Sequence, residues 1–203
     1  MFDRVAIKKQ AKANFKAHYG TSLGVYVLIM LAFSGASSIS YGVGAFFLMP
    51  MLVGLSYFML NTYNGNKPEF GEAFSQSFKN YARKLGGMLW MCLFACLWTL
   101  LFIVPGIIKS LAYSMTPYIL ADCPNVEATA ALKISMKMTK GYKGDIFVMY
   151  LSFIGWGLLS ALTCGVLEFL YVGPYRETAC AGMYEALKKI ALDAGTVTQE
   201  ELS

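Results

Sequence analysis

The chain alternates long apolar runs with short charged segments. Six apolar runs cover 22–38, 43–62, 85–104, 107–121, 146–164 and 166–187. Four of them carry no charged residue, the fourth carries Lys109, and the last carries four charged residues. A bilayer hydrocarbon core of about 30 Å is crossed by roughly 20 helical residues, and about 17 is near the lower limit. By this measure the first run is marginal, the fourth is short, and the other four are long enough. The pattern predicts about six membrane spans, with 107–121 as either a tilted span or a re-entrant segment.

Within each run the apolar residues follow one another without alternation. Backbone N–H and C=O groups must be paired internally in lipid, so a spanning segment is either an α-helix or a strand of a closed barrel. Barrel strands alternate apolar and polar residues, and these runs do not. We therefore expect an all-α, polytopic transmembrane helix bundle of three hairpins, formed by a single integral membrane domain over residues 1–203.

The basic residues predict how the spans are oriented. Fifteen of the seventeen Lys and Arg residues fall in the charged segments 1–21, 63–84, 122–145 and 188–203. The turns between paired runs, at 39–42, 105–106 and 165, contain none. Loops on the cytoplasmic side carry an excess of Lys and Arg. The charged segments are therefore expected inside the cell, with both termini cytoplasmic and the first span uncleaved.

The charged segments themselves have helical patterns, which predict amphipathic helices at about 3–19, 69–84 and 125–140. Apolar residues recur every three or four positions in each, and lysines lie off the apolar face. The three faces are Ile7, Ala11, Phe15 and Tyr19; Phe70, Phe74, Phe78, Tyr81 and Leu85; and Val126, Ala130, Ile134 and Met138. We expect helices lying in the inner membrane interface, with lysines toward anionic headgroups. Packing on a partner protein is the alternative.

Composition supports a membrane location and argues against a soluble domain or a nucleic-acid-binding protein. Hydrophobic residues make up 57% of the chain and charged residues 14%, against roughly 25% charged residues in soluble proteins. So few charges could not cover the surface of a soluble domain. The net charge of +5 is divided among separate clusters, so no nucleic-acid partner is expected. The partners expected are the lipid bilayer, anionic headgroups, and a protein partner or a second copy of the chain.

Charged residues inside the predicted spans are the candidates for a polar site, because a charge at mid-membrane is costly. Arg176 lies ten residues into the last run, or about 15 Å at the rise of an α-helix. Glu177 is adjacent, and Pro174 just before them is expected to break the helix. Broken helices at mid-depth form binding sites in transporters. Alternatively, Arg176 fixes packing against a carboxylate or tyrosines, or the pair lies at the interface.

Three other charged residues lie near predicted span ends. Glu168 and Lys109 are expected near the outer ends, where long side chains reach the interface at little cost. Asp122, just before Pro124, is expected to cap a helix or form a turn. Glu168 and Lys109 are added to the candidate polar site with Arg176, Glu177 and Pro174.

No pattern in the sequence indicates catalysis or a cofactor. Phosphate-binding Gly-rich motifs, metal-ligand spacings and Ser–His or Cys–His arrangements are absent. Cys92 and Cys96 would share a helix face, but they are expected to be small reduced thiols rather than metal ligands. We expect no enzyme, no metal and no cofactor. Three functional hypotheses follow. The first is a non-enzymatic membrane component that supports a partner or the membrane, and the second is a small-solute or lipid transporter or channel. The third is a lipid-modifying enzyme, which the absence of a catalytic set disfavours.

Four stretches of the sequence resemble one family. They are "IKKQAKANFKAHYG", "IVPGIIKSLAYSMTPYILADCP", "ALKISMKMTKGYKGDIFVMYLSFIGWGLLSALTCG" and "VGPYRETACAGMY". The family is DUF975, uncharacterised bacterial integral membrane proteins, and the resemblance covers essentially the whole chain. It implies a bacterial plasma-membrane location and no agreed function. A more distant resemblance is to the membrane domain fused to some glycerophosphodiester phosphodiesterases. The phosphodiesterase half is absent from this sequence, so that resemblance implies no activity. Arg176–Glu177 is not part of the family pattern.

Overall fold

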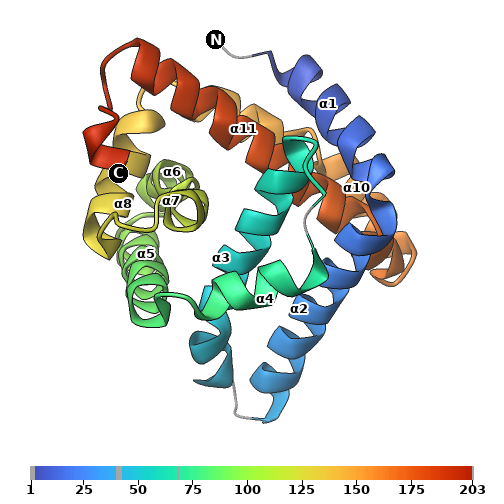
Figure 1. Ribbon diagram of the computed structural model, residues 1–203. Helices are drawn as coiled ribbons and strands as arrows, with labels where there is room; N and C mark the ends of the chain where they lie inside the picture. Colours follow the sequence, from blue (N-terminus) through green and yellow to red (C-terminus); the bar gives the residue numbers. More distant parts are fainter. Residues whose placement is uncertain (1–2, 40–42, 68, 203) are drawn as a thin grey trace.

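The computed structural model describes residues 3–39, 43–67 and 69–202, and within them every regular element is helical. The expected turn at 39–42 lies largely outside the described residues. In chain order the helices are α1 (Arg4–Ala17), α2 (Tyr19–Ile39), α3 (Val43–Tyr63), α4 (Phe70–Phe78), α5 (Tyr81–Leu101), α6 (Ile103–Tyr113), α7 (Thr116–Asp122), α8 (Ala128–Met138), α9 (Lys143–Leu151), α10 (Ile154–Leu162), the π-helix η1 (Glu168–Val172), α11 (Gly173–Asp193) and the 3₁₀-helix η2 (Glu200–Leu202) (Figure 1). The predicted all-α class is confirmed.

Four helical segments among the described residues are long and apolar enough to cross a membrane. They are Tyr19–Ala36, Gly44–Tyr63, Tyr81–Leu101 and Lys143–Leu162. They correspond to the first, second, third and fifth apolar runs of the sequence. These four segments are compatible with a membrane protein.

The fourth run, 107–121, is not one continuous helix. Its residues belong to α6 and then to α7, with Ser114 and Met115 between them. Pro117 occupies the first turn of α7. Because proline has no N–H, it cannot extend the hydrogen-bond ladder of a preceding helix, and it is well tolerated only where a new helix begins. The fourth run is therefore a bent pair of short helices, which explains its short apolar length.

The last run also differs from prediction, because the helix does not break at Gly173–Pro174. Val172 and Gly173 both have right-handed helical backbone angles, and η1 leads directly into α11. A π-helix pairs each residue with the fifth one along, and it often marks functional sites. Pro174 lies in the first turn of α11. The change in helical type just before Pro174 accommodates the proline without a break.

Helix α11 crosses the upper part of the fold in Figure 1. It packs against α1, α3 and α8, and most residues between Gly173 and Leu187 are buried. At Gly182 it lies close to α3, because any Cβ atom there would overlap the ring of Tyr63. A small residue at this position lets two helices touch.

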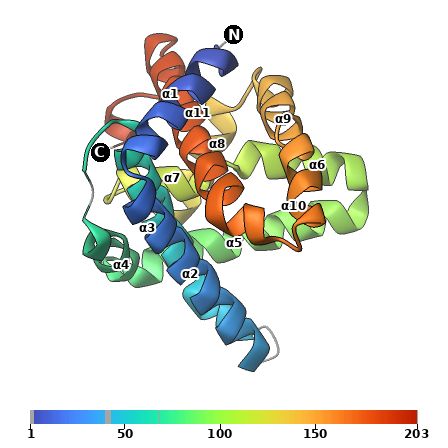
Figure 2. The ribbon, with the colours of Figure 1, turned by 90° about the vertical axis from the view of Figure 1, so that its right-hand side faces the viewer.

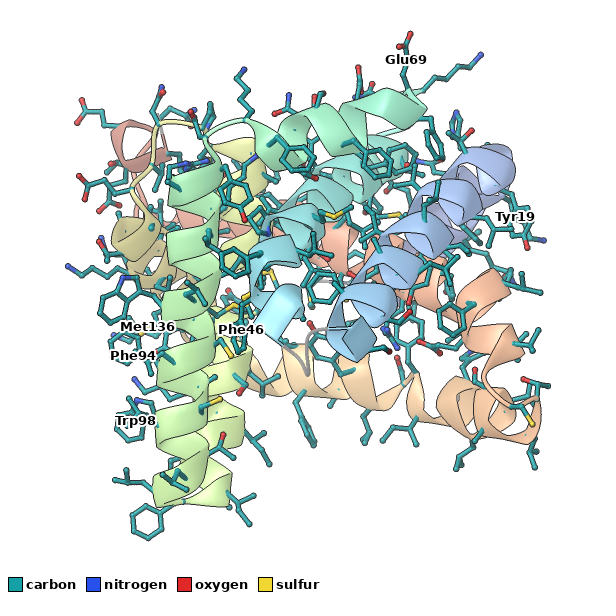
Figure 3. All side chains as sticks on the ribbon, turned by 90° about the horizontal axis from the view of Figure 1, so that it is seen from below. Tyr19, Phe46, Glu69, Phe94, Trp98 and Met136 are labelled. Atoms are coloured by element: carbon teal, nitrogen blue, oxygen red, sulfur yellow. The ribbon has the colours of Figure 1, made fainter. Side chains whose placement is uncertain are left out.

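The candidate spans do not run parallel to one another. Helix α2 packs beside α3, and α5 beside α6, but α5–α6 lies across the direction of α9–α10 (Figure 2). The turn between α5 and α6 exposes five consecutive apolar side chains over residues 100–104, and Leu100 is 86% exposed. Figure 3 shows this tip at the lower end of the long helix that carries Phe94 and Trp98. The surface in this region is covered by apolar side chains.

Two of the predicted amphipathic helices have their apolar faces covered by the protein itself. In α1 the buried residues are Ile7, Ala11 and Phe15, and the helix packs on α11. In α8, which begins at Ala128, Ile134 and Met138 are buried among other core residues. The apolar periodicity of these two helices therefore marks a face that packs on the protein core. We had expected these faces to contact the bilayer.

The predicted helix 69–84 is divided in two by Asn80, whose φ of 54° lies in the left-handed region. In the first part, α4, Phe70 is 41% exposed and Phe78 is 60% exposed, while Phe74 is partly buried against the core. Ala73 and Ser77 lie on the adjoining part of the same helix face and are buried against α3. We call Phe70, Phe74 and Phe78 the aromatic face of α4.

The contact between α4 and α3 depends on Gly54. A Cβ atom at this position would overlap the Ser77 hydroxyl and the carbonyl oxygen of Ala73. We therefore expect Gly54→Ala to cost about 1–3 kcal/mol through overpacking and to lower the thermal unfolding midpoint of the purified chain. Gly71→Ala is the control, because Gly71 has open space around its Cα. Equal midpoints for the two variants would contradict close packing at Gly54.

Candidate functional site

Three charged residues meet where η1 joins α11. The shortest ion pair joins Arg176 Nη1 to Glu168 Oε1 at 2.7 Å, and Arg176 Nε lies 3.9 Å from Glu177 Oε1. The side chains of the three residues are between 26% and 33% exposed. We call Glu168, Arg176 and Glu177 the charge cluster. It contains one cation and two carboxylates.

Helical geometry explains which carboxylate pairs closely. Neighbouring residues in an α-helix point about 100° apart, so Arg176 and Glu177 are poorly placed to bond each other. Glu168 lies in the π-helical turn, which holds more residues per turn than an α-helix and so changes which side chains share a side of the helix. The sequence assigned Glu168 to an outer span end, but it is the main partner of Arg176. This matches the alternative in which Arg176 packs against a carboxylate.

Two hydroxyl groups satisfy the remaining carboxylate oxygens. Tyr118 of α7 donates its O–H to Glu177 Oε2 at 3.3 Å, and Ser160 of α10 donates to Glu168 Oε2 at 3.4 Å. The ring of Tyr118 stacks on that of Tyr184, with centroids 5.7 Å apart. The charge cluster therefore connects α7, α10, η1 and α11. Polar groups away from water are costly unless they are hydrogen-bonded, and here each has a partner.

A cavity of about 240 Å³ lies beside Glu177. Its walls come from α2, α3, α5, α7 and α11, together with Tyr150 of α9. They are mainly apolar, and Glu177 is the charged member of the lining. The lining residues are Met30, Leu52, Leu55, Ser56, Met88, Met91, Ser114, Pro117, Tyr118, Tyr150, Glu177 and Cys180. Methionine side chains are flexible and fill irregular spaces. The cavity thus presents one carboxylate in adaptable apolar walls, and neither Arg176 nor Glu168 is among its lining residues.

The other two predicted site residues have different places. Pro174 lies in the first turn of α11, and its carbonyl oxygen accepts a hydrogen bond from Thr178 at 2.8 Å. Lys109 lies in α6 with its ammonium 5.0 Å from the ring centroid of Trp98 in α5. A cation over an aromatic face gains electrostatic attraction. Lys109 therefore helps to hold α5 against α6 and is not brought to the charge cluster.

A second polar network was not predicted. Asp122 Oδ2 accepts hydrogen bonds from Tyr184 Oη at 2.8 Å and from Lys188 Nζ at 2.5 Å. Burial by itself lowers the pKa of Lys188, but the hydrogen bond and charge of Asp122 outweigh it and raise the pKa overall. Asp122 was expected to cap a helix or form a turn, but it joins the end of α7 to α11. Its partners lie more than sixty residues away, so local sequence could not identify them.

Two basic residues at the start of α5 donate hydrogen bonds to backbone carbonyl groups in and near two other helices. Arg83 donates to the carbonyl oxygens of Leu120, Cys123 and Val126 at 2.7, 2.9 and 2.5 Å. Lys84 is buried and donates to the carbonyl oxygen of Gln76 in α4. The last carbonyls of a helix lack intrahelical partners and favour cations. In the predicted helix 69–84, Arg83 and Lys84 would lie in the last turn. In the structure they begin α5, and they bind carbonyl groups of α4 and around the end of α7.

Comparison with known proteins identifies a family and no activity. Residues 88–191, about half of the chain, match the model of a family described as "Protein of unknown function (DUF975)". The match runs from α5 to α11 and includes the whole charge cluster. No curated protein and no solved structure matches the chain.

The charge cluster generates a test of pairing. Arg176→Gln leaves two carboxylates close together without their cation. We expect it to lower the free energy of unfolding by about 1–3 kcal/mol, a loss that the partial exposure of the three side chains limits. Adding Glu168→Gln should restore part of that loss, because it removes one of the two unpaired carboxylates. The measurement is thermal unfolding of the detergent-purified variants. Additive losses in the double variant would mean that the two residues act independently.

Proposed function

We propose that this chain, which belongs to the DUF975 family of proteins of unknown function, is a non-enzymatic membrane component that supports a protein partner or the membrane itself. It acts in the bacterial cell membrane through contacts on the cytoplasmic side. The single observation that carries this proposal is the exposure of Phe70 and Phe78 on the aromatic face of α4.

Phe70 and Phe78 are 41% and 60% exposed, although Ala73 and Ser77 beside them pack tightly on α3. Large exposed apolar patches mark sites of interaction with proteins or membranes. Lys79 follows directly at the end of α4, where it is suited to anionic headgroups. An aromatic surface of this kind, held on a rigid helix pair, favours contact with something outside the fold.

The proposed topology is six spans, arranged as three hairpins, with both termini in the cytoplasm. In Figure 2 the α5–α6 turn lies at the right edge and the α10–η1 turn lies at the lower end of α10, while the N-terminus lies at the top and the C-terminus at the left. These two turns are therefore set apart from both termini. This division supports the orientation that the basic residues predict.

The partners of the charge cluster favour a structural role for it. Arg176, Glu168 and Glu177 bind one another, and Tyr118 and Ser160 complete their hydrogen bonds. A catalytic acid or base must reach a substrate proton, and here the carboxylates are occupied by protein groups. We therefore propose a non-enzymatic role for the chain.

A small-solute or lipid transporter or channel is the second candidate, and the cavity beside Glu177 is the observation that favours it. A carboxylate lining a cavity inside a predicted membrane protein is a candidate for binding a cation or proton. Glu177→Gln separates the candidates, because the amide still accepts a hydrogen bond from Tyr118. A loss of solute movement at unchanged protein abundance favours transport.

The proposed topology predicts which cysteines a membrane-impermeant maleimide reaches in intact cells. Cys164 is exposed at the turn after α10, and Phe102 is 66% exposed at the α5–α6 turn. We expect Cys164 and a Phe102→Cys variant to be labelled from outside, each in a background without other cysteines. Lys140→Cys should require permeabilised cells.

Phe102 is a better position than Gly106, where a larger residue would overlap Thr99. Labelling of Lys140→Cys in intact cells would overturn the orientation. Labelling of Cys164 without Phe102→Cys would mean that α5 and α6 form a re-entrant unit that does not reach the outer surface.

The aromatic face of α4 predicts a contact that crosslinking can detect. A photoreactive phenylalanine analogue at position 78 should form adducts with lipid or with one protein in native membranes. The same analogue at Glu72 is the control, because Glu72 lies off the aromatic face. No adducts at position 78 would mean that the aromatic face contacts only water. Equal adducts at the two positions would mean that the contact is not specific to the aromatic face.

A further inference from the structure

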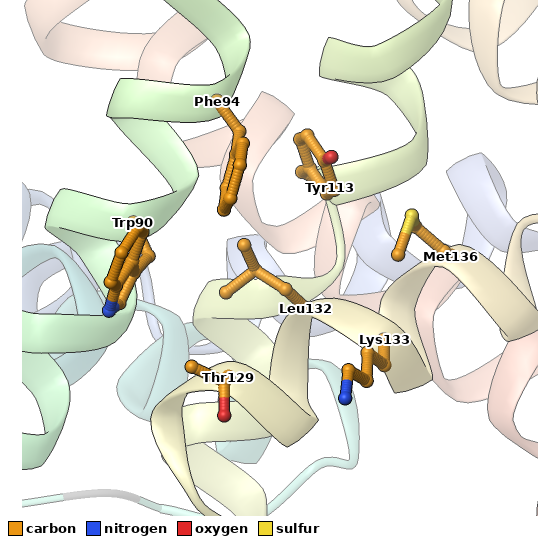
Figure 4. Close-up of a pocket in the computed structure, with 7 residues that line it drawn as sticks. All are labelled: Trp90, Phe94, Tyr113, Thr129, Leu132, Lys133 and Met136. Carbon is orange, nitrogen blue, oxygen red and sulfur yellow. The ribbon is translucent and has the colours of Figure 1, made fainter.

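A groove of about 410 Å³ lies between α5 and α8 and is separate from the Glu177 cavity. Its lining residues are Trp90, Phe94, Tyr113, Thr129, Leu132, Lys133 and Met136 (Figure 4). Trp90 and Phe94 come from α5, Tyr113 ends α6, and the other four residues lie on α8. None of these residues belongs to the charge cluster.

One wall of the groove is aromatic and partly open. The rings of Trp90 and Phe94 stack with centroids 5.4 Å apart and planes 20° apart. Trp90 is 43% exposed and Phe94 is 37% exposed. Leu132 and Met136 lie across from them on α8 (Figure 4). This wall suits an extended apolar chain.

The charged residue of the groove, Lys133, lies at one end beside Thr129, and the hydroxyl of Tyr113 lies at the other end. Thr129 and Lys133 lie four residues apart on α8, so they share one side of the helix. Figure 4 shows the hydroxyl of Thr129 and the ammonium of Lys133 at the lower end, with Phe94 and Tyr113 at the upper end. Within the described part of the chain neither group has a hydrogen-bond or ion-pair partner. Lys137 on the same helix differs, because it pairs with Glu201 at 2.5 Å.

The apolar end continues along α5 toward the exposed tip. Trp90, Phe94 and Trp98 recur every four residues and form one stripe. In Figure 3 Met136 lies beside Phe94, and Trp98 follows toward the tip. From Trp90 to Leu101 the helix rises about 16 Å. The surface thus runs from the unpaired Lys133 along the rings of Trp90 and Phe94. Beyond them lies Trp98, whose ring carries the ammonium of Lys109 at 5.0 Å.

From the unpaired Lys133 and the aromatic wall beside it we infer that the groove binds one anionic glycerophospholipid. Its phosphate lies against Lys133 and Thr129, and one acyl chain follows Trp90 and Phe94. A peptide ligand would bring backbone N–H and C=O groups to an aromatic wall that offers them no partner, whereas an acyl chain has none. This inference rests on the proposed function, because it requires α5 to cross the bilayer.

Tryptophan fluorescence in vesicles tests the groove. The chain has three tryptophans, so Trp98→Phe with Trp156→Phe leaves Trp90 as the reporter. Trp90→Phe with Trp98→Phe leaves Trp156 of α10, which is 37% exposed, as a reporter away from the groove. Each chain is reconstituted in phosphatidylcholine vesicles that contain the same share of phosphatidylglycerol or phosphatidylcholine with brominated acyl chains, which quench nearby tryptophan.

We expect brominated phosphatidylglycerol to quench Trp90 with about a fivefold preference over brominated phosphatidylcholine, which corresponds to about 1 kcal/mol from one basic residue. Lys133→Gln should remove the preference, and Lys133→Arg should keep it. Lys140→Gln, which removes an exposed charge outside the groove, should leave it unchanged. Inorganic phosphate should not reduce it, because a free anion lacks the acyl chain.

Four results would overturn the inference. The first is an equal preference at Trp90 and Trp156, and the second is an equal loss in Lys133→Gln and Lys140→Gln; both would mean a general attraction between charges and the membrane. The third is loss of the preference in inorganic phosphate, which would make the groove a site for phosphate alone. The fourth is the absence of quenching of either tryptophan by any brominated lipid. That result would mean that the chain is not in the bilayer, and it alone would overturn the proposed function as well.

Discussion

The ion pair between Arg176 and Glu168 is the constraint on which the centre of the molecule depends. Helix α11 carries an arginine and a glutamate into a region that is otherwise packed with apolar side chains. A charge can stay there only if an opposite charge and hydrogen bonds accompany it. The π turn supplies Glu168, α7 supplies Tyr118, and α10 supplies Ser160. The charge cluster therefore joins α7, α10 and η1 to α11 through polar contacts.

The same logic holds at the ends of the shorter helices. Breaks in a helix free carbonyl groups, and a protein that borders lipid must pair them by itself. Arg83 binds three such carbonyls around the end of α7, and Lys84 binds one in α4. Both cations come from the first turn of α5, directly after Asn80. A short charged segment of the sequence therefore stabilises two neighbouring helices as well as its own.

Hydropathy along the chain predicted helical class and the four segments that are long enough to span a membrane, because these depend on composition over about 20 residues. It failed where one residue changes the backbone. Pro117 divides the fourth run, and Asn80 separates α4 from α5. Arg176 and Glu177 could be identified as candidates from their depth in an apolar run. Tyr118 could not, because its contact with Glu177 joins residues 59 positions apart and exists only in the folded chain.

Helix α3 separates the aromatic face of α4 from the Glu177 cavity by the thickness of one helix. Gly54 holds α4 on one side of α3, while Leu52, Leu55 and Ser56 line the cavity on the other. At Gly54 the two backbones leave no space for a side chain, so α4 cannot shift toward α3 without displacing it. A partner that binds Phe70 or Phe78 therefore contacts a helix packed directly on α3, which is also a wall of the cavity. A displacement of α4 toward α3 would move that wall and change the volume beside Glu177.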